Sequence, residues 1–499
     1  MFAESQFVFS FEKLLLLSAV ATFCLMTSVH AVIYKRNSYS AFGWLTFILL
    51  APSLSALMYL FLGWRGVLVI FPLVGSILYV CLGVNRLSRK FRKGDFRLTE
   101  TKIDLNTITA KNSGIKRDSK WLAISTTGKN LGYSAEHYCQ IDILNSGDQA
   151  YPQMLAAIAQ AKKSISLFSY IFNDDDTGMA FCQALIAAKN RGIEVRVLID
   201  AVGSHKSRNT VIKTLRKHKI PAKVFMRVLI KTQFSNLRNH RKLLIVDGET
   251  AFTGGLNISQ LYWPEKYGDG GVIDLHFLVR GYLVNYLQET FANDWAFTTK
   301  EKLTDDIWYS DNIIEAGNCI GRVIADGPSF EEERMRWHFL NAINSAHHHI
   351  RILTPYFLPD APISAALCSA ALRGVNVEIL LPDSSDHSYM DWALRGSMND
   401  MLARGCQFYF SPPPFDHSKL MLIDAEYASI GSANWDERSL RLNYELNIEL
   451  SGREITEQLH QLFDQKIARA KHYTLKDLNR RPKLQQLRDG ITRLFSPYL

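Results

Sequence analysis

The sequence has few cysteines, and they are not spaced as structural cysteines usually are. No two of them form a C-x2-C pair, and their number is odd. A scattered and odd set argues against a disulfide framework and a zinc site, and it indicates a reducing compartment. The seven positions are Cys24, Cys81, Cys139, Cys182, Cys319, Cys368 and Cys406.

The composition also lacks the bias of a disordered chain, because 47% of the residues are hydrophobic and 21% are charged. A length of 499 residues exceeds one average domain and predicts two or three folded units. The formal net charge of +9 predicts attraction to anionic partners, which leaves nucleic acid and acidic lipid both open.

Charged residues are absent from long stretches near the N-terminus. Residues 14–34 and 41–63 contain no Asp, Glu, Lys or Arg, and each is long enough to cross a hydrocarbon core of roughly 30 Å. Residues 67–84 form a third apolar run close to the minimum spanning length. The sequence therefore predicts a membrane anchor over residues 1–85 with two or three transmembrane helices.

Basic residues beside these runs predict the orientation of the anchor. Lys35 and Arg36 follow the first run, and five basic residues lie between positions 86 and 93. Three spans place both groups in the cytoplasm, whereas two spans place Lys35 and Arg36 outside. In either arrangement the rest of the chain stays in the cytoplasm, beginning with a basic linker over residues 86–135.

The remainder of the chain contains a long internal repeat. Residues 157–176 resemble residues 341–360, and each stretch leads into a helical segment, an Arg-Gly pair and an apolar strand. This order predicts an α/β fold with two repeated lobes, residues 136–310 (the first lobe) and 311–480 (the second lobe), each with a mainly parallel central sheet. Their interface is the expected place for a shared site.

The last segment, residues 481–499, is predicted to be an amphipathic tail. Leu484, Leu487, Ile491 and Leu494 have helical spacing and are accompanied by basic residues. Such a helix either lies on a membrane or packs on the second lobe.

Two H-x-K-x4-D motifs are the most specific feature of the sequence. Each is followed by the same tail, so the full pattern is H-x-K-x4-D-x6-G-[GS]-x-N in both copies. Two copies at the same point of a repeated lobe predict one shared site. The candidate catalytic residues are His240, Lys242, Asp247, His417, Lys419 and Asp424, and the candidate substrate-binding residues are Asn257 and Asn434.

The residue types suit a phosphate diester. Residues two apart on an extended strand point to the same face, so the histidine and lysine of each motif project together. Two lysines and two asparagine amides can neutralise and bind the phosphoryl oxygens, so no metal or other cofactor is expected. One histidine would attack phosphorus and form a phosphohistidine, while the other protonates the leaving oxygen.

Each imidazole needs a partner that fixes its tautomer. Asp274 and Glu445 lie downstream of their motifs and are the candidates; the alternative makes them solvated carboxylates at strand ends. Asp247 and Asp424 are expected to anchor loops through hydrogen bonds rather than to act as catalysts.

The motifs and the stretches around them resemble the phospholipase D superfamily, and within it the bacterial cardiolipin synthases. The resemblance covers nearly the whole chain and includes NLRNHRKLLIVDG, TPYFLPD, GSANWDERSLRLNYELN and RLFSPYL. It implies a multi-pass protein of the bacterial cytoplasmic (inner) membrane that joins two phosphatidylglycerol molecules into cardiolipin and glycerol. His240 would be the nucleophile and His417 the acid and base, with both lysines and both asparagines binding phosphate. The third apolar run is a departure, because such enzymes usually look two-spanning.

Other functions of the same residues stay open. A membrane-bound phospholipase D-type hydrolase would release phosphatidic acid and would differ only in admitting water. A nuclease is disfavoured by the predicted anchor, because its substrate is soluble, and no nucleic-acid partner is expected. A lipid-binding scaffold is disfavoured because neither motif has lost a histidine or a lysine. The expected partners are phosphatidylglycerol and an anionic phospholipid membrane.

Overall fold

The computed structural model describes residues 133–204, 207–226, 237–268, 270–311, 317–328, 333–494 and 496, with a few isolated residues before 132. The chain forms two compact units, Met1–Gly94 with Leu229–Ser235 and Asp95–Val228 with Asn236–Leu499. The predicted anchor and most of the linker lie outside the described residues. Among the residues that are described, no helix is long and apolar enough to cross a membrane. All helices and strands from β1 onward belong to the second unit.

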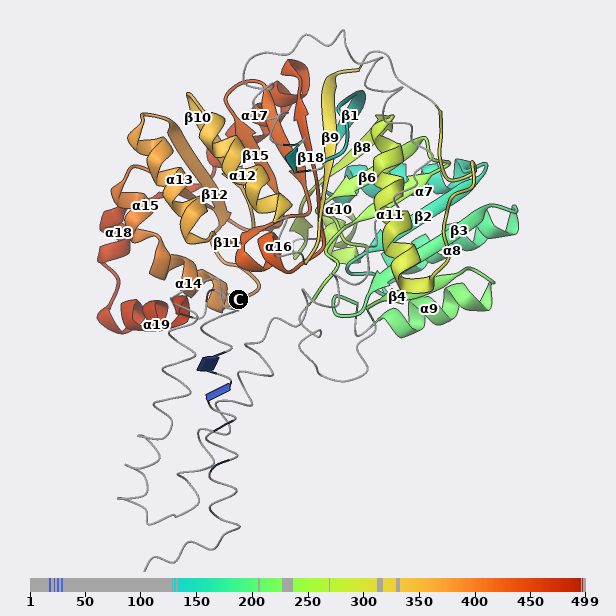
Figure 1. The fold of residues 1–499 in the computed structure, drawn as a ribbon, viewed down its shortest axis with the longest axis horizontal. Helices are drawn as coiled ribbons and strands as arrows, with labels where there is room; N and C mark the ends of the chain where they lie inside the picture. The colour runs from blue at the N-terminus through green and yellow to red at the C-terminus, as the bar shows by residue number, and fades with distance from the viewer. Residues whose placement is uncertain are drawn as a thin grey trace, which may run out of the picture. The chain divides into compact units, whose positions relative to one another are not determined.

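The first lobe alternates helices and strands before it forms hairpins (Figure 1). Its elements are β1 (His137–Asn145), α7 (Ser146–Gln160), β2 (Ser164–Ser169), α8 (Asp176–Asn190), β3 (Glu194–Asp200), α9 (Arg208–Lys217), β4 (Ala222–Phe225), β5 (Leu243–Val246), β6 (Thr250–Gly254), η4 (Gln260–Tyr262), α10 (Pro264–Tyr267), β7 (Val272–Ile273), β8 (Leu275–Gly281) and α11 (Leu283–Thr299).

The second lobe repeats this plan and adds a C-terminal group of helices. Its elements are β9 (Cys319–Asp326), α12 (Arg334–Ser345), β10 (His349–Leu353), β11 (Phe357–Leu358), α13 (Ala361–Leu372), β12 (Asn376–Pro382), α14 (Ser388–Ser397), α15 (Asn399–Ala403), β13 (Gln407–Ser411), β14 (Phe415–Asp416), β15 (Leu420–Ile423), β16 (Tyr427–Gly431), β17 (Trp435–Asp436), α16 (Glu437–Arg441), β18 (Glu445–Ser451), α17 (Arg453–Ile467), β19 (Lys471–Tyr473), α18 (Leu475–Asn479) and α19 (Lys483–Arg493).

The two lobes share one continuous 15-stranded sheet, whose halves are the cyan-green and orange-red parts of Figure 1. The strand order is β19-β13-β12-β10-β15-β16-β18-β9-β1-β8-β6-β5-β2-β3-β4. Outward from the central β9–β1 pair, the strands β8, β6, β5, β2, β3 and β4 correspond to β18, β16, β15, β10, β12 and β13. The internal repeat in the sequence is therefore a spatial repeat about this pair.

The prediction of mainly parallel sheets is wrong. Only β2–β3, β3–β4, β10–β12 and β12–β13 are parallel pairs within the large sheet, and its other neighbouring pairs are antiparallel. The Arg-Gly strands β3 and β12 follow crossover helices and are parallel to their neighbours, as expected. The motif strands β5 and β15 instead enter tight hairpins, and a hairpin can only join antiparallel strands.

The apolar core extends across both lobes. One cluster of buried side chains contains Leu283 and Phe291 of α11 together with Leu459 and Phe463 of α17. Two further clusters lie within the second lobe and the first lobe, respectively. Because the central cluster draws on both lobes, separating them would expose apolar surface, and the interface between them is rigid.

The turn that closes each motif hairpin is held by the aspartate of the motif. The carboxylate of Asp247 accepts the backbone N–H groups of residues 162–164 at 2.6–3.1 Å. The carboxylate of Asp424 accepts those of residues 347–349 at 2.7–3.0 Å. Both residues have positive φ, at 56° and 50°. This is the loop-anchoring arrangement expected from the sequence. Both aspartates of the candidate catalytic set therefore stabilise the fold.

We predict that Asp247→Asn lowers the free energy of unfolding by about 1–3 kcal/mol, because an amide leaves some of these N–H groups without an acceptor. Denaturation of the purified variant, followed by circular dichroism, measures the change. Asp305→Asn, at an exposed carboxylate, is the matched control and should leave the stability unchanged. Wild-type stability of the Asp247 variant would contradict the anchoring role.

Candidate active site

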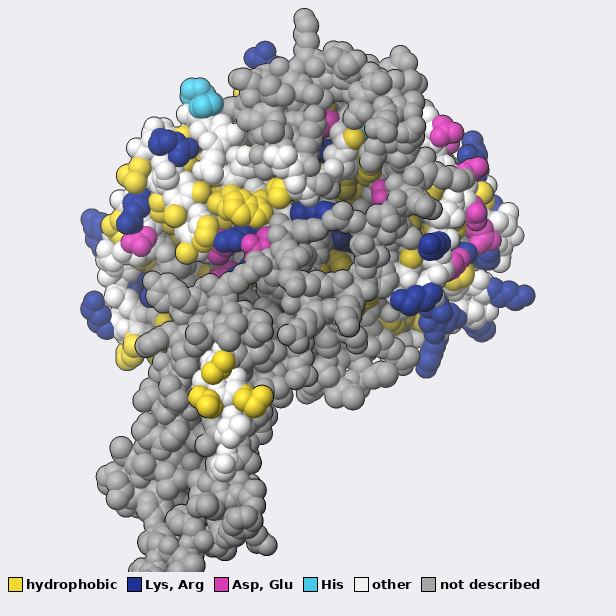
Figure 2. Space-filling model, viewed as in Figure 1, with side chains coloured by type: hydrophobic (Ala, Val, Ile, Leu, Met, Phe, Trp, Pro, Cys, Tyr) yellow, Lys and Arg dark blue, Asp and Glu magenta, His cyan; other side chains and the backbone are white. Residues whose placement is uncertain are grey.

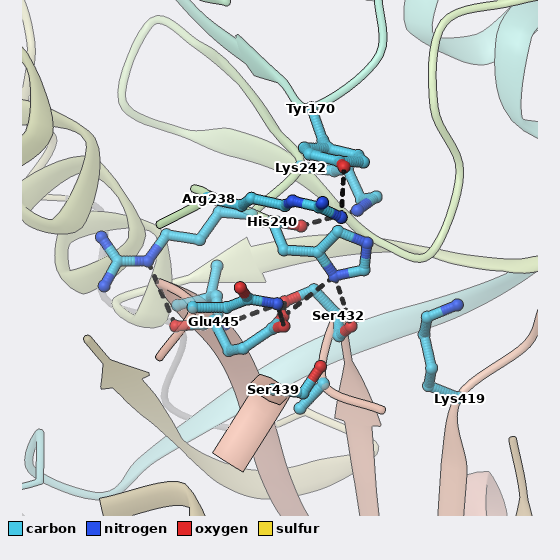
Figure 3. A network of polar contacts seen from close by, with 12 residues as sticks. Tyr170, Arg238, His240, Lys242, Lys419, Ser432, Ser439 and Glu445 are labelled. Atoms are coloured by element: carbon cyan, nitrogen blue, oxygen red, sulfur yellow. Dashed lines mark hydrogen bonds and ion pairs between the residues drawn. The ribbon is translucent and has the colours of Figure 1, made fainter. Parts of the chain in front are cut away.

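The structure brings the two motifs together in one buried site (Figure 3). His240 and Lys242 lie in the extended segment that leads into β5, and His417 and Lys419 occupy the same place before β15. All four side chains are buried, and the two imidazole rings have their centroids 6.5 Å apart. The pairing of histidine with lysine on one face follows from the two-residue period of an extended chain.

Each motif segment is held by the backbone of the opposite lobe. The N–H of His240 donates to the carbonyl of Tyr444 at 2.8 Å, and that of His417 donates to the carbonyl of Ile273 at 2.7 Å. The short parallel pair β14–β7 extends the second contact. The site is therefore assembled by backbone pairing across the lobe interface and does not exist in either lobe alone.

The two candidate orienting acids also cross between the lobes. Glu445 Oε2 lies 3.2 Å from Nδ1 of His240, and Asp274 Oδ2 lies 2.7 Å from Nδ1 of His417. Both carboxylates are fully buried, so the alternative of solvated strand-end acids is wrong. The sequence pointed to both acids but did not reveal that each one faces the histidine of the other lobe.

The environments of the two acids push their pKa values in opposite directions. Burial raises the pKa of Asp274 to about 7, despite the positive charge of Lys419. Burial also opposes ionisation of Glu445, but hydrogen bonds from His240 and, at 2.5 Å, from Ser432 Oγ, together with the charge of Lys242, bring its pKa below the usual value. At neutral pH Glu445 is a carboxylate, whereas Asp274 is close to half protonated.

One difference between the motif tails explains how these acids fit. A Cβ atom on Gly255 would lie 2.0 Å from Asp274 Oδ1, so only glycine leaves room for that carboxylate. The second lobe has Ser432 at the equivalent position, and its hydroxyl donates to Glu445. The glycine admits the acid in the first lobe, and the serine binds the acid in the second.

Burial and crowded positive charge keep the histidines neutral. Burial and Lys242 lower the pKa of His240, and burial and Lys419 lower that of His417 well below its ordinary value. Burial, with the charge of Lys419, lowers the pKa of Lys242 to about 7, and burial lowers that of Lys419 to about 8. The site thus holds two uncharged imidazoles beside two lysines that retain much of their charge at neutral pH.

The hydrogen bonds fix the tautomer of His240, whereas His417 can adopt either of two tautomers. Nδ1 of His240 faces the carbonyl of Ser432 at 3.1 Å and the Glu445 carboxylate, which are both acceptors. This nitrogen therefore carries the hydrogen, and Nε2 carries the lone pair. Nδ1 of His417 faces both Asp274 and the Lys419 ammonium, the latter at 2.9 Å. It can donate to the first or accept from the second, so its tautomer depends on the proton of Asp274.

The two candidate asparagines are engaged differently. Asn257 is held by the N–H of Ile171 at 3.2 Å and donates to the hydroxyl of Tyr262 at 2.8 Å. The Tyr262 ring lies 5.9 Å from that of His417. Asn434 is buried, and its Oδ1 has no hydrogen-bond partner among the described residues. No cluster of His, Cys, Asp and Glu in the described ranges could hold a metal ion.

Three residues at the site were missed by sequence reasoning. The ring of Tyr170 lies 4.9 Å from that of His240, and Arg238 donates to the Tyr170 hydroxyl at 3.4 Å. Arg241 donates to both oxygens of Asp294 at 2.8 Å and to the carbonyls of Asp326 and Glu445. The signal was weak: the tyrosine looks like a core residue of the repeat, and both arginines look like ordinary neighbours of the motif.

Comparisons with known proteins agree with this geometry. Residues 154–295 and 339–467 match the family described as "Cardiolipin synthase, PLD-like domain". A cardiolipin synthase of Oceanobacillus iheyensis is 33% identical over 363 residues, covering 72% of this chain and 75% of that protein. Cardiolipin synthase A of Pseudomonas aeruginosa is 29% identical over 493 residues, covering 97% and 96%. The crystal structure of phosphatidylserine synthase from Haemophilus influenzae shares the fold, with a TM-score of 0.60 and 15% identity over 77% of this chain and 100% of that one. The chain therefore belongs to the phospholipase D-like cardiolipin synthase family.

Proposed function

We propose that this protein is a cardiolipin synthase, which transfers the phosphatidyl group of one phosphatidylglycerol to a hydroxyl of a second and releases glycerol. The main support for this proposal is the buried pair of imidazoles, each facing a carboxylate of the other lobe and each beside a lysine. Two lysines supply the positive charge that a phosphodiester needs in its transition state. We infer further that the substrate is drawn from a bacterial cytoplasmic membrane to which residues 1–85 anchor the chain.

His240 is the nucleophile in this proposal. Its Nε2 carries the lone pair because Nδ1 is committed to two acceptors. Attack of Nε2 on phosphorus forms a P–N bond and breaks the P–O bond to glycerol. The ionised Glu445 stabilises the positive charge that develops on the imidazole.

His417 is the acid and then the base. It shares a proton with Asp274, whose raised pKa of about 7 keeps that proton available at neutral pH. The imidazole passes a proton to the leaving glycerol oxygen in the first step. In the second step it takes the proton of the incoming hydroxyl, which attacks phosphorus, breaks the P–N bond and frees His240. Two acids with opposite pKa shifts thus support the division of roles between the histidines.

A phospholipase D-type hydrolase with the same residues is the alternative. The acceptor in the synthase is itself an anionic lipid, so it needs cations beyond those that bind the transferred phosphate. Arg238 and Arg438 supply such charge beside Tyr170, and burial together with the charge of Arg238 lowers the pKa of Arg438. We infer that these cations, which lie among the acids Asp200 and Asp436, favour an anionic alcohol over water as the acceptor.

The decisive experiment incubates the full-length protein, purified in detergent, with labelled phosphatidylglycerol and identifies the products by mass. We expect cardiolipin and glycerol in equal amounts. Phosphatidic acid as the sole product would establish the hydrolase instead. Protein quenched in neutral sodium dodecyl sulfate should carry an acid-labile phosphatidyl-histidine that His240→Ala abolishes and His417→Ala retains, and the reverse pattern would exchange the two roles.

The two orienting acids should fail in different ways. We predict that Asp274→Asn and Glu445→Gln each slow turnover of phosphatidylglycerol by about 10²–10⁴-fold, since each substitution removes the carboxylate that supports proton transfer or charge at one histidine. An acidic phenol can leave as phenolate without receiving a proton. With a phosphatidyl ester of such a phenol as the substrate, single-turnover release of the phenol should therefore recover in the Asp274 variant. The Glu445 variant should stay slow with both substrates. Equal behaviour of the two variants would contradict the assignment.

The activity should fall as the pH rises. The lysines carry their charge only below their lowered pKa values, about 7 for Lys242 and about 8 for Lys419. We therefore expect kcat/KM to decline from about pH 7 upward, and loss of the Asp274 proton acts in the same direction. Lys242→Arg keeps its charge at high pH and should move the decline upward, at some cost in rate. A decline that stays in place would assign it to Asp274 alone.

A further inference from the structure

The C-terminal helix α19 is amphipathic, but its apolar side faces outward. Its exposed leucines and isoleucine follow one another at intervals of three and four residues, which places them on one face of the helix. We call this face the outward stripe; its side chains Leu484, Leu487, Ile491 and Leu494 are 81%, 60%, 51% and 70% exposed. Figure 2 shows hydrophobic side chains on the outside of the molecule at the position of α19, at the lower left.

The opposite side of α19 is fixed to the protein by polar contacts. Asp489 is fully buried and forms ion pairs with Arg481 and Arg488, the second at 2.8 Å. The guanidinium of Arg488 lies 4.4 Å from the ring of Trp392 in α14. A Cβ atom on Gly396 of α14 would lie 2.5 Å from the Asp489 carbonyl, so the two helices approach closely. These contacts hold the outward stripe in place, and α19 cannot turn it inward without breaking them.

Helix α14, against which α19 packs, also borders the active site. His387 caps the N-terminus of α14, and its ring stacks on Tyr356 with centroids 6.0 Å apart. The Tyr356 ring lies 6.3 Å from that of His417. A continuous path of packed side chains therefore connects the catalytic histidine to α14 and through it to α19.

The charge around the outward stripe is strongly positive. Residues 480–494 include one acid, Asp489, which is buried and paired. Their basic residues are Arg480, Arg481, Lys483, Arg488 and Arg493, of which Arg480, Lys483 and Arg493 are exposed. Arg480 and Lys483 lie at the start of the helix and Arg493 at its end, where the Cβ of Arg493 faces Gly396 of α14. An apolar stripe with exposed cations at both ends of its helix is the pattern of a helix that lies in the head-group region of an anionic bilayer.

We propose that α19 is a docking helix for the surface of an anionic phospholipid bilayer. The outward stripe enters the boundary between head groups and acyl chains, and the flanking arginines and lysine bind lipid phosphates. Docking at this point would hold the second lobe, and with it His417, close to the surface from which a lipid substrate is drawn. The proposal rests on the proposed function only in its lipid substrate, because the stripe and its charges are independent of the reaction.

The depth of α19 in a membrane tests the proposal. Full-length Leu487→Cys protein, carrying a spin label and reconstituted in nanodiscs, is compared with Gln485→Cys, an exposed position on the other side of the same helix. Unsubstituted protein treated with the same spin label measures the background signal from the native cysteines. We expect the label at 487 to be reached by oxygen and shielded from a water-soluble nickel chelate in phosphatidylglycerol discs, while the label at 485 stays in water. Equal exposure at both positions would overturn the proposal.

The same labels distinguish the other possible occupants of the stripe. Shielding at 487 from oxygen as well as from the nickel chelate would mean that another segment of this chain or a second copy covers the stripe, because packed protein excludes both reagents. Shielding that is equal in uncharged phosphatidylcholine discs would remove the role of the flanking cations. Either result contradicts the proposal as stated, and neither depends on which reaction the enzyme performs.

A kinetic test uses the double variant Leu484→Ser/Leu487→Ser. Losing two leucines that enter the bilayer on docking should lower kcat/KM on phosphatidylglycerol vesicles by about tenfold or more. Activity on dispersed short-chain phosphatidylglycerol should be unchanged, because the site itself is intact. Leu372→Ser, at a 70% exposed leucine of α13, should match the wild type on both substrates. An equal loss on both substrates would make the stripe structural, and absence of transfer in the wild type would instead reject the proposed function.

Discussion

The buried carboxylate–imidazole contacts that cross between the lobes are the constraint on which the rest of the structure depends. Each lobe holds one histidine and the acid that faces the histidine of the other lobe. A misplacement of even an ångström at such a site costs rate, so the lobes cannot be loosely joined. The continuous sheet through β1 and β9 and the shared apolar core satisfy that demand. The fold is one rigid frame built from two copies of a smaller plan.

The same burial sets the chemistry. Taking two lysines, two histidines and two acids out of water disfavours every charge, and the balance among them decides which survive. The histidines lose their charge, the lysines keep theirs only up to about neutral pH, and Glu445 stays ionised while Asp274 takes up a proton more readily than a solvated acid.

The sequence predicted the parts of this arrangement that depend on local spacing. The paired motifs, the two orienting acids and the Arg-Gly strands β3 and β12 were all readable, because period and spacing are local properties. The exchange of acids between lobes, the antiparallel majority of the sheet and the buried Arg241–Asp294 pair were not, since each depends on which strands become neighbours. Gly255 is an example of what the sequence does not reveal. The glycine is visible in the motif tail, but the carboxylate of Asp274, which requires a glycine at this position, lies 19 positions later.

The repeat also explains how two identical motifs acquire different roles. Beside His240, the cation Arg241 lies on the motif segment and its partner Asp294 on helix α11. Beside His417, the signs are reversed: the anion Asp416 lies on the motif segment and Lys466 on helix α17. The charge of Asp416 contributes to the raised pKa of Asp274 and so helps to keep a proton at His417. Since the H-x-K-x4-D residues themselves are the same, the division of labour that we propose for the histidines must come from surrounding charges such as these, one placed after His240 and the other before His417.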